Sequence, residues 1–208
     1  LQLYGDFSGG MDVIMGASEC FGISLDANFK RPYFAQSISD FWHRWHITLG
    51  TWMKDYVFYP FSLSKGMNKF GKFCKKHFGK HVSRVLPVCI ANLLVFFLVG
   101  VWHGPAWKFI VYGLYNGIII AASNLFSPFY GEMARKLHIP VESRSWMVVR
   151  ILRTFLLVNV SWYFDMAVSL GAALTMMKNT VTGFSLAALW NGSLLRLGLD
   201  LKDYAALA

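Results

Sequence analysis

Imidazole side chains in aromatic surroundings are the groups of this sequence best suited to proton transfer near neutral pH. Residues 41–56 read FWHRWHITLGTWMKDY, and residues 98–107 read LVGVWHGPAW. In the second stretch His103 closes an uncharged apolar run, and Gly104-Pro105 then breaks the helix. An apolar site tolerates a neutral imidazole far better than a charged one. We therefore expect His103 to be an uncharged proton acceptor, unless it only bonds a backbone carbonyl at the helix end.

The first stretch holds two histidines, His43 and His46. On a continuous helix, residues three apart lie on one face, and Asp40 would lie one turn earlier. These three groups could ligate a metal, but no further Cys or His follows at metal-site spacing, so we disfavour a metal site. Alternatively, His43 faces solvent and His46 is buried beside Trp45.

The cysteines predict neither a disulfide framework nor a metal centre. Three cysteines at irregular spacing do not form a pairing pattern. Cys74, His77 and His81 resemble a metal-site spacing, but they lie among six lysines and an arginine, which repel a divalent cation. We expect no metal and no tightly bound cofactor.

The composition indicates a membrane protein. The chain has 208 residues, 55% of them hydrophobic and only 15% charged, with a mean hydropathy of +0.42. Soluble domains carry about 25% charged residues. The net charge of +9 comes from basic residues between apolar runs, as in cytoplasmic loops of membrane proteins. No nucleic-acid-binding motif is present, so we do not expect nucleic acid as a partner.

Three apolar segments must position the histidines. Residues 85–102 carry no charge and would rise about 27 Å as a helix, nearly the hydrocarbon thickness. Residues 107–126 are long enough to return, and residues 147–174 contain a third span. We expect an all-α, polytopic protein of the plasma membrane, with residues 1–208 forming a single integral membrane domain.

A basic segment sets the expected orientation. Residues 65–84 hold seven Lys or Arg and no acid, which predicts a cytoplasmic loop near acidic headgroups. The mildly basic loop 127–146 should lie on the same side. Trp102 and His103 would then lie toward the opposite face of the membrane.

The remaining segments do not resemble simple lipid-facing helices. Residues 1–25 include three acids, so this helix should be packed inside a bundle or lie near an interface. After a loop at 26–36, Ser37 is a plausible N-cap for an amphipathic helix over 38–59, which we expect to be interfacial or re-entrant. We expect residues 175–208 to form short amphipathic helices on the outer side.

Three ordered motifs together resemble the membrane-bound O-acyltransferase family: YGDFSGGMDVIMGASECFGI, NFKRPYFAQSISDFWHRWHITLGTWMKDYVFYP and GVWHGPAWKFIVYGLYNG. The resemblance implies a ring of tilted helices around a thinned centre, with a tunnel between the two faces. It also implies that the chain is the C-terminal part of the family core, without its N-terminal helices. The chain departs from the family at His43 and at residues 162–167, WYFDMA, where a phenylalanine-arginine-alanine signature is common.

The resemblance implies roles for particular residues. His103 corresponds to the presumed catalytic histidine of the family, and His46 to its second histidine. From charge and position we add residues that would line the tunnel or bind the phosphates of the donor: Trp102, Trp45, Trp42, Asp6, Arg44 and Lys54.

The resemblance further implies acyl transfer from a thioester or an acyl carrier protein to a hydroxyl of an envelope polysaccharide, or to an outer-side partner acyltransferase. Acetyl is the expected group, and D-alanyl transfer toward teichoic acid is the alternative. Two non-enzymatic classes remain open, a membrane transporter and a scaffold that recruits another acetyltransferase.

Overall fold

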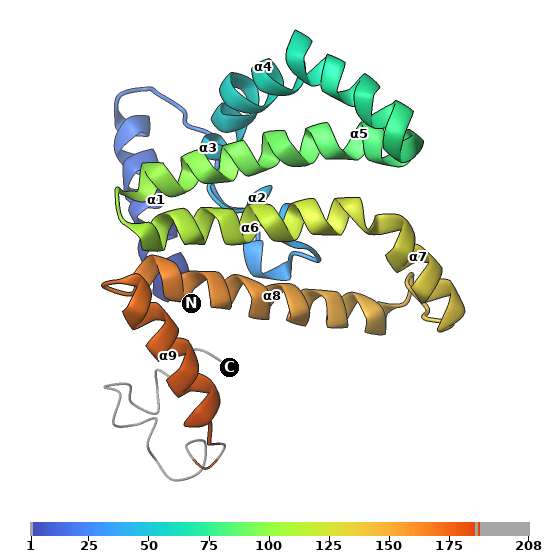
Figure 1. The fold of residues 1–208 in the computed structure, drawn as a ribbon. Helices are drawn as coiled ribbons and strands as arrows, with labels where there is room; N and C mark the ends of the chain where they lie inside the picture. Colours follow the sequence, from blue (N-terminus) through green and yellow to red (C-terminus); the bar gives the residue numbers. More distant parts are fainter. Residues whose placement is uncertain (1, 186, 188–208) are drawn as a thin grey trace.

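The computed structural model describes residues 2–185 and residue 187, and these residues confirm the all-α expectation. Three long helices lie side by side in Figure 1: α5 (Lys65–His103), α6 (Trp107–Leu125) and α8 (Arg144–Met166). The helix α1 (Gln2–Cys20) lies near the end at which α5 passes into α6. Within the described residues, the only β pairing is an isolated bridge between Phe29 and Trp45.

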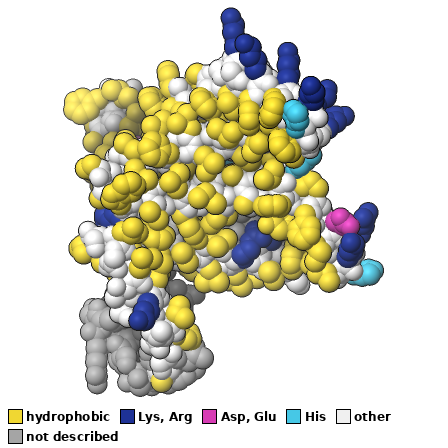
Figure 2. Space-filling model, viewed as in Figure 1, with side chains coloured by type: hydrophobic (Ala, Val, Ile, Leu, Met, Phe, Trp, Pro, Cys, Tyr) yellow, Lys and Arg dark blue, Asp and Glu magenta, His cyan; other side chains and the backbone are white. Residues whose placement is uncertain are grey.

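The lengths and hydropathy of these helices confirm a multi-pass membrane protein. Both α5 and α8 are long and apolar enough to cross a bilayer. The helix α6 meets the same standard together with α7 (Ser127–Lys136), from which it is bent by 61°. Figure 2 shows a broad hydrophobic surface over these helices, with Lys and Arg gathered toward one end. Such a surface fits contact with lipid.

The loop predicted over 127–146 was partly wrong. Residues 127–136 form the helix α7 rather than a loop, with Pro128 in its first turn, where proline is tolerated. The third span, expected within 147–174, is α8 and ends at Met166. Ser169 then caps a separate helix, α9 (Leu170–Thr182), by accepting a hydrogen bond from the Ala172 amide. The predicted outer-side helices of 175–208 lie mostly outside the described residues.

The basic segment 65–84 is helical, so the predicted loop was wrong. Ser64 caps the start of α5 by accepting a hydrogen bond from the Met67 amide. The helix is interrupted at Gly79, whose φ of 85° lies in the region that glycine tolerates. The chain reverses there in Figure 1, so that Gly71 lies against Ser83 and Pro87. Repulsion among the lysines does not outweigh their good helix propensity.

The predicted continuous helix over 38–59 was also wrong. It begins as expected at Ser37, but four shorter elements replace it: α2 (Ile38–Trp42), α3 (Ile47–Met53), a π-helical turn (Lys54–Phe58) and α4 (Tyr59–Ser62). Between α2 and α3 the chain leaves the helix to pair with the segment before the short 3-10 helix Pro32–Phe34. The Lys30 amide donates to the Arg44 carbonyl, and the Ile47 amide donates to the Asn28 carbonyl. His43 and His46 therefore do not share a helix face.

The core of the described chain is aromatic. Trp45 is 4% exposed, stacks on Phe41 with ring centroids 5.5 Å apart, and contacts Trp162 of α8 at 5.1 Å. Trp162 in turn stacks on Tyr112 of α6 at 5.8 Å. This cluster fixes the segment that carries His46 against α6 and α8.

Glycines allow α5 and α6 to approach closely. A Cβ atom on Gly113 would clash with the Phe96 carbonyl oxygen, and one on Gly100 would clash with that of Phe109. Small residues at such crossings let helix backbones pack directly against each other in a membrane. The α5–α6 contact fixes where the His103 end of α5 lies.

Replacing Gly113 by alanine should therefore destabilise the protein by about 1–3 kcal/mol, the usual cost of overpacking. The thermal unfolding midpoint in detergent measures the effect. Gly131→Ala in α7 is the matched control, because no heavy atom lies within 4 Å of its added Cβ. Equal midpoints for the two variants would contradict the close contact.

Candidate active site

His103 is the last residue of α5, and the predicted helix break follows it directly. Gly104 caps the helix with φ 152°, in the range that favours glycine. The Nδ1 atom of His103 lies 3.3 Å from a carboxylate oxygen of Asp165, near the end of α8. The side chain of His103 is 25% exposed and that of Asp165 14%. Both groups therefore remain partly accessible while facing each other.

His46 precedes α3 in a left-handed backbone conformation, with φ 48° and ψ 54°. This conformation costs a non-glycine residue roughly 1–3 kcal/mol and is found most often at functional sites. Glycine would adopt this conformation without strain. Its ring packs edge-on against Phe7 of α1, with centroids 4.9 Å apart.

Asn28 determines which nitrogen of His46 carries the proton. Its side-chain oxygen accepts hydrogen bonds from the Thr48 amide at 3.2 Å and from the Thr48 hydroxyl at 2.7 Å. A backbone amide can only donate, so the Asn28 atom is an acceptor, and the His46 Nδ1 atom 3.0 Å away must be the donor. In neutral His46 the Nε2 atom is therefore free to accept a proton, and a hydrogen bond donated from Nε2 requires the imidazolium form.

The two histidines converge from different parts of the chain. The centroid of the Trp102 ring lies 4.9 Å from that of the His103 ring and 5.9 Å from that of the His46 ring. Burial lowers the pKa of His46, and charge on His103 lowers it further. His46 is therefore predominantly neutral at pH 7.

A cavity of about 390 Å³ lies beside His46, and neither His103 nor Trp102 is among its described lining residues. His46 lines it, as does Val99, which lies one helical turn before His103 on the same face of α5. The cavity runs between the α2–α3 segment and α5, and its wall is mostly apolar. The cavity is also lined by Trp42, Trp45, His43 and Lys54.

The remaining predicted site residues fall into two groups. Trp42 and Trp45 line the cavity, and the Trp42 indole donates to the fully buried Asn116 of α6 at 3.3 Å. Trp102 is 55% exposed beside both histidines. Asp6 is exposed on α1, and no described contact joins it to the histidines.

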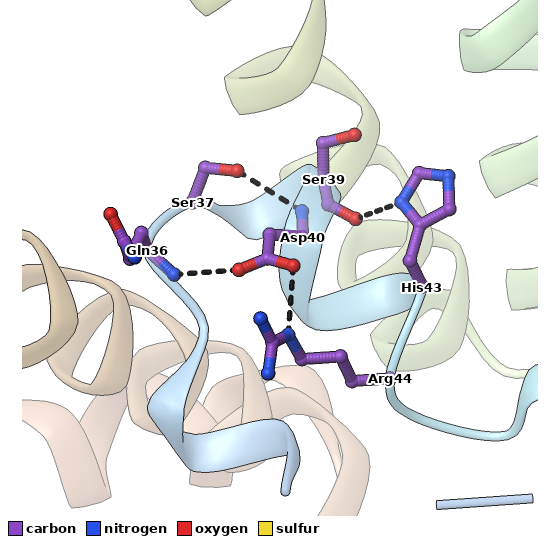
Figure 3. A network of polar contacts seen from close by, with 6 residues as sticks. All are labelled: Gln36, Ser37, Ser39, Asp40, His43 and Arg44. Carbon is purple, nitrogen blue, oxygen red and sulfur yellow. Dashed lines mark hydrogen bonds and ion pairs between the residues drawn. The ribbon is translucent and has the colours of Figure 1, made fainter. Parts of the chain in front are cut away.

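Arg44 is occupied elsewhere. Its Nε atom donates to Asp40 at 2.8 Å, and the other Asp40 oxygen accepts from the Gln36 amide at 3.0 Å (Figure 3). Burial opposes ionisation of Asp40, but Arg44 and Gln36 outweigh it and hold the pKa of this carboxyl below its usual value. The same figure shows His43 turned to the Ser39 carbonyl. Lys54, rather than Arg44, is the cation at the cavity wall.

Two residues of this site were missed in the sequence. Asn28 lies in a loop, and its role depends on pairing between segments 18 residues apart. Asp165 is separated from His103 by 62 positions and meets it only because α5 and α8 flank α6. A single acid near the end of an apolar span was the one available signal for Asp165.

A comparison with known protein families identifies the family of this chain. The model of the membrane-bound O-acyltransferase family matches residues 2–162. The chain belongs to this family.

Curated proteins of three kinds are among those similar to this member of the O-acyltransferase family. The chain is 35% identical over 182 residues to the peptidoglycan O-acetyltransferase of Helicobacter pylori, covering 86% of the chain and 29% of the relative. It is 34% identical over 175 residues to the probable alginate O-acetylase AlgI of Azotobacter vinelandii, covering 84% and 30%. It is 33% identical over 164 residues to the teichoic acid D-alanyltransferase of Bacillus subtilis, covering 78% and 38%. The chain thus spans about a third of the length of these relatives.

The lowered pKa of His46 predicts a pH dependence of stability. The unfolded chain binds a proton at His46 more readily than the folded protein does. The contribution of neutral His46 to the free energy of unfolding is therefore complete above about pH 6.5 and is lost as the pH falls toward the lowered pKa. The thermal midpoint should therefore fall between about pH 7.5 and pH 5.5, and His46→Asn should reduce that fall, since Asn tolerates the left-handed backbone. His138→Asn is the control, because His138 is an exposed histidine with φ 51°. A fall of equal size in all three proteins would contradict the assignment.

Proposed function

We propose that the protein is an O-acyltransferase of the plasma membrane that moves an acyl group, preferably acetyl, from a thioester donor to a hydroxyl of an envelope polysaccharide. The observation that carries the proposal is the convergence of two histidines on Trp102, with His46 lining the adjoining cavity. In each, Nδ1 faces an acceptor side chain, Asp165 or Asn28, so that Nε2 is left for chemistry. Membership of the family and the similarity to two proteins named as O-acetylating enzymes support this choice.

The proposed reaction needs a base next to the attacking hydroxyl. Nε2 of His103 accepts the hydroxyl proton as the oxygen forms a bond to the acyl carbon. The carbon–sulfur bond of the thioester then breaks, and the proton passes from His103 to the departing thiolate. His103 returns to its neutral form, and no further reactant is required.

The surroundings suit this reaction. The developing oxyanion needs a hydrogen-bond donor, which the exposed Trp102 indole beside both histidines can supply. The apolar cavity, lined by Trp42 and Trp45, excludes water that would hydrolyse the thioester. Lys54 at its wall is placed to attract phosphates of the donor.

The basic segment supports an orientation across the membrane. Residues 65–84 lie at the far end of α5 from His103, and their excess of Lys and Arg favours the cytoplasmic side. The donor would then approach from the cytoplasm. The acceptor, a polysaccharide or an outer-side partner acyltransferase, would reach His103 from the opposite face.

D-alanyl transfer is the second candidate for the acyl group. The similarity to a teichoic acid D-alanyltransferase favours it, as does the basic segment, which could dock an acidic carrier protein.

Mass analysis of the envelope polymer from cells with and without the gene tests the proposal. We expect an acyl group to be missing from the deletion strain, and its mass to distinguish acetyl from D-alanyl. Identical polymers in the two strains would overturn the proposal. Defective transport with unchanged acylation would favour a transporter.

A further inference from the structure

We propose that Asp165 is a positioning residue for His103: its carboxylate faces Nδ1, leaves Nε2 as the proton acceptor and stabilises the imidazolium formed during transfer. The inference rests on the proposed acyltransferase function and deepens it. It concerns an acid in the stretch WYFDMA, residues 162–167.

The contact geometry supports this role. The Nδ1–carboxylate distance of 3.3 Å is longer than a charge-assisted hydrogen bond, as is common before substrate binds. Within the described residues, His103 is the only group at ion-pair distance from the Asp165 carboxylate. The carboxylate is therefore available to the imidazole and is not neutralised by another partner.

Lys108 holds the end of α8 in place without competing for this carboxylate. Its Nζ atom donates to the main-chain carbonyls of Asp165 and Ala167, at 2.8 and 2.6 Å. It also lies 4.1 Å from the centroid of the Phe109 ring, which packs beside His103. The α6 segment after the helix break thus joins the two partners from α5 and α8.

The other groups facing His103 give Asp165 a distinct task. Burial and charge on His103 both lower the pKa of His46, the residue before α3, so His46 does not favour being charged together with His103. Trp102, Phe109 and Tyr112 contribute rings, with Tyr112 at 5.1 Å. Asp165 is the one anion in this shell of described residues, so it alone stabilises the charged intermediate form of His103.

The chemical consequence follows the logic of an orienting carboxylate behind a catalytic imidazole. In neutral His103, a hydrogen on Nδ1 directed at Asp165 leaves the lone pair on Nε2, where it can accept the hydroxyl proton. When Nε2 takes the proton, the positive charge forms beside a fixed negative one. An amide at position 165 would keep the shape but lose the charge.

The test is Asp165→Asn in the full-length protein in membranes, with transfer of labelled acyl groups measured across pH. We expect kcat to fall at least about tenfold with KM nearly unchanged. The acidic limb of the pH–rate profile should move to lower pH, because the imidazolium loses its stabilising carboxylate. Asp165→Glu should restore part of the rate, and the exposed Glu142→Gln, which also exchanges a carboxylate for an amide, should leave the rate unchanged.

The outcomes separate this inference from the proposed function. A normal kcat and pH profile in Asp165→Asn, with an inactive His103→Ala, overturns the inference alone. Activity in both variants overturns the inference and the function together. If Asp165→Asn does not reach the membrane, Asp165→Ser removes the same charge, and the same criteria apply to it.

Discussion

Replacement of His103 by alanine should lower kcat for acyl transfer by about 10²–10⁴-fold, the usual contribution of a general base. No other described group at this place can take the hydroxyl proton in the same geometry, since the Nε2 atom of His46 belongs to a separately held ring. KM should change little, because His103 is not part of the cavity wall that we propose binds the donor. Initial rates with membranes of matched protein content measure the effect.

The matched control is His77→Ala, which removes an exposed imidazole from the same helix α5. It should retain the wild-type rate. A His103→Ala variant that keeps full activity would exclude His103 as the base, whatever the control shows.

His46→Gly should reduce kcat by about 10²-fold, the expected size for loss of a group that positions reactants. Glycine adopts the left-handed backbone of this position without strain, so the change removes the imidazole and its contact with Asn28 while sparing the fold. Single-turnover transfer of the acyl group would separate a slower chemical step from weaker donor binding.

His138→Gly provides the comparison for this variant. It places glycine at a second histidine with positive φ, which is exposed and lies after α7. We expect normal transfer in His138→Gly. If His46→Gly were equally active, His46 would be a structural residue only.

Local and compositional signals explain what the sequence predicted well. The uncharged run before His103 and the following Gly104-Pro105 define a helix and its end without reference to any other segment. Likewise, Ser37 caps its helix because its hydroxyl oxygen accepts a hydrogen bond from the backbone amide of Asp40, three residues later. Features of this kind depend on residues that are neighbours in the chain.

Tertiary pairing explains what the sequence could not predict. The helical period of 41–52 is sound, but the segment breaks at His46 because Phe29 pairs with Trp45. The left-handed backbone conformation of His46 could not be predicted from neighbouring residues, since glycine rather than histidine usually occupies such a position. Asp165 joins the site only through the packing of α6 between α5 and α8.

The charge pattern of 65–84 did not reveal the secondary structure of this segment, which is helical. Lysines are acceptable in both loops and helices, so their number does not discriminate between the two. Gly79 permits the chain reversal that divides α5 into two helical halves. Figure 2 shows the cations gathered at that end.

The most direct test of the central claim is an experimental structure of the full-length protein with an acyl acceptor bound. The account predicts that the acceptor hydroxyl lies within about 3 Å of Nε2 of His103, with Nδ1 turned to Asp165. A hydroxyl held away from His103, or a His103 ring closed off from both the donor and the acceptor, would contradict it.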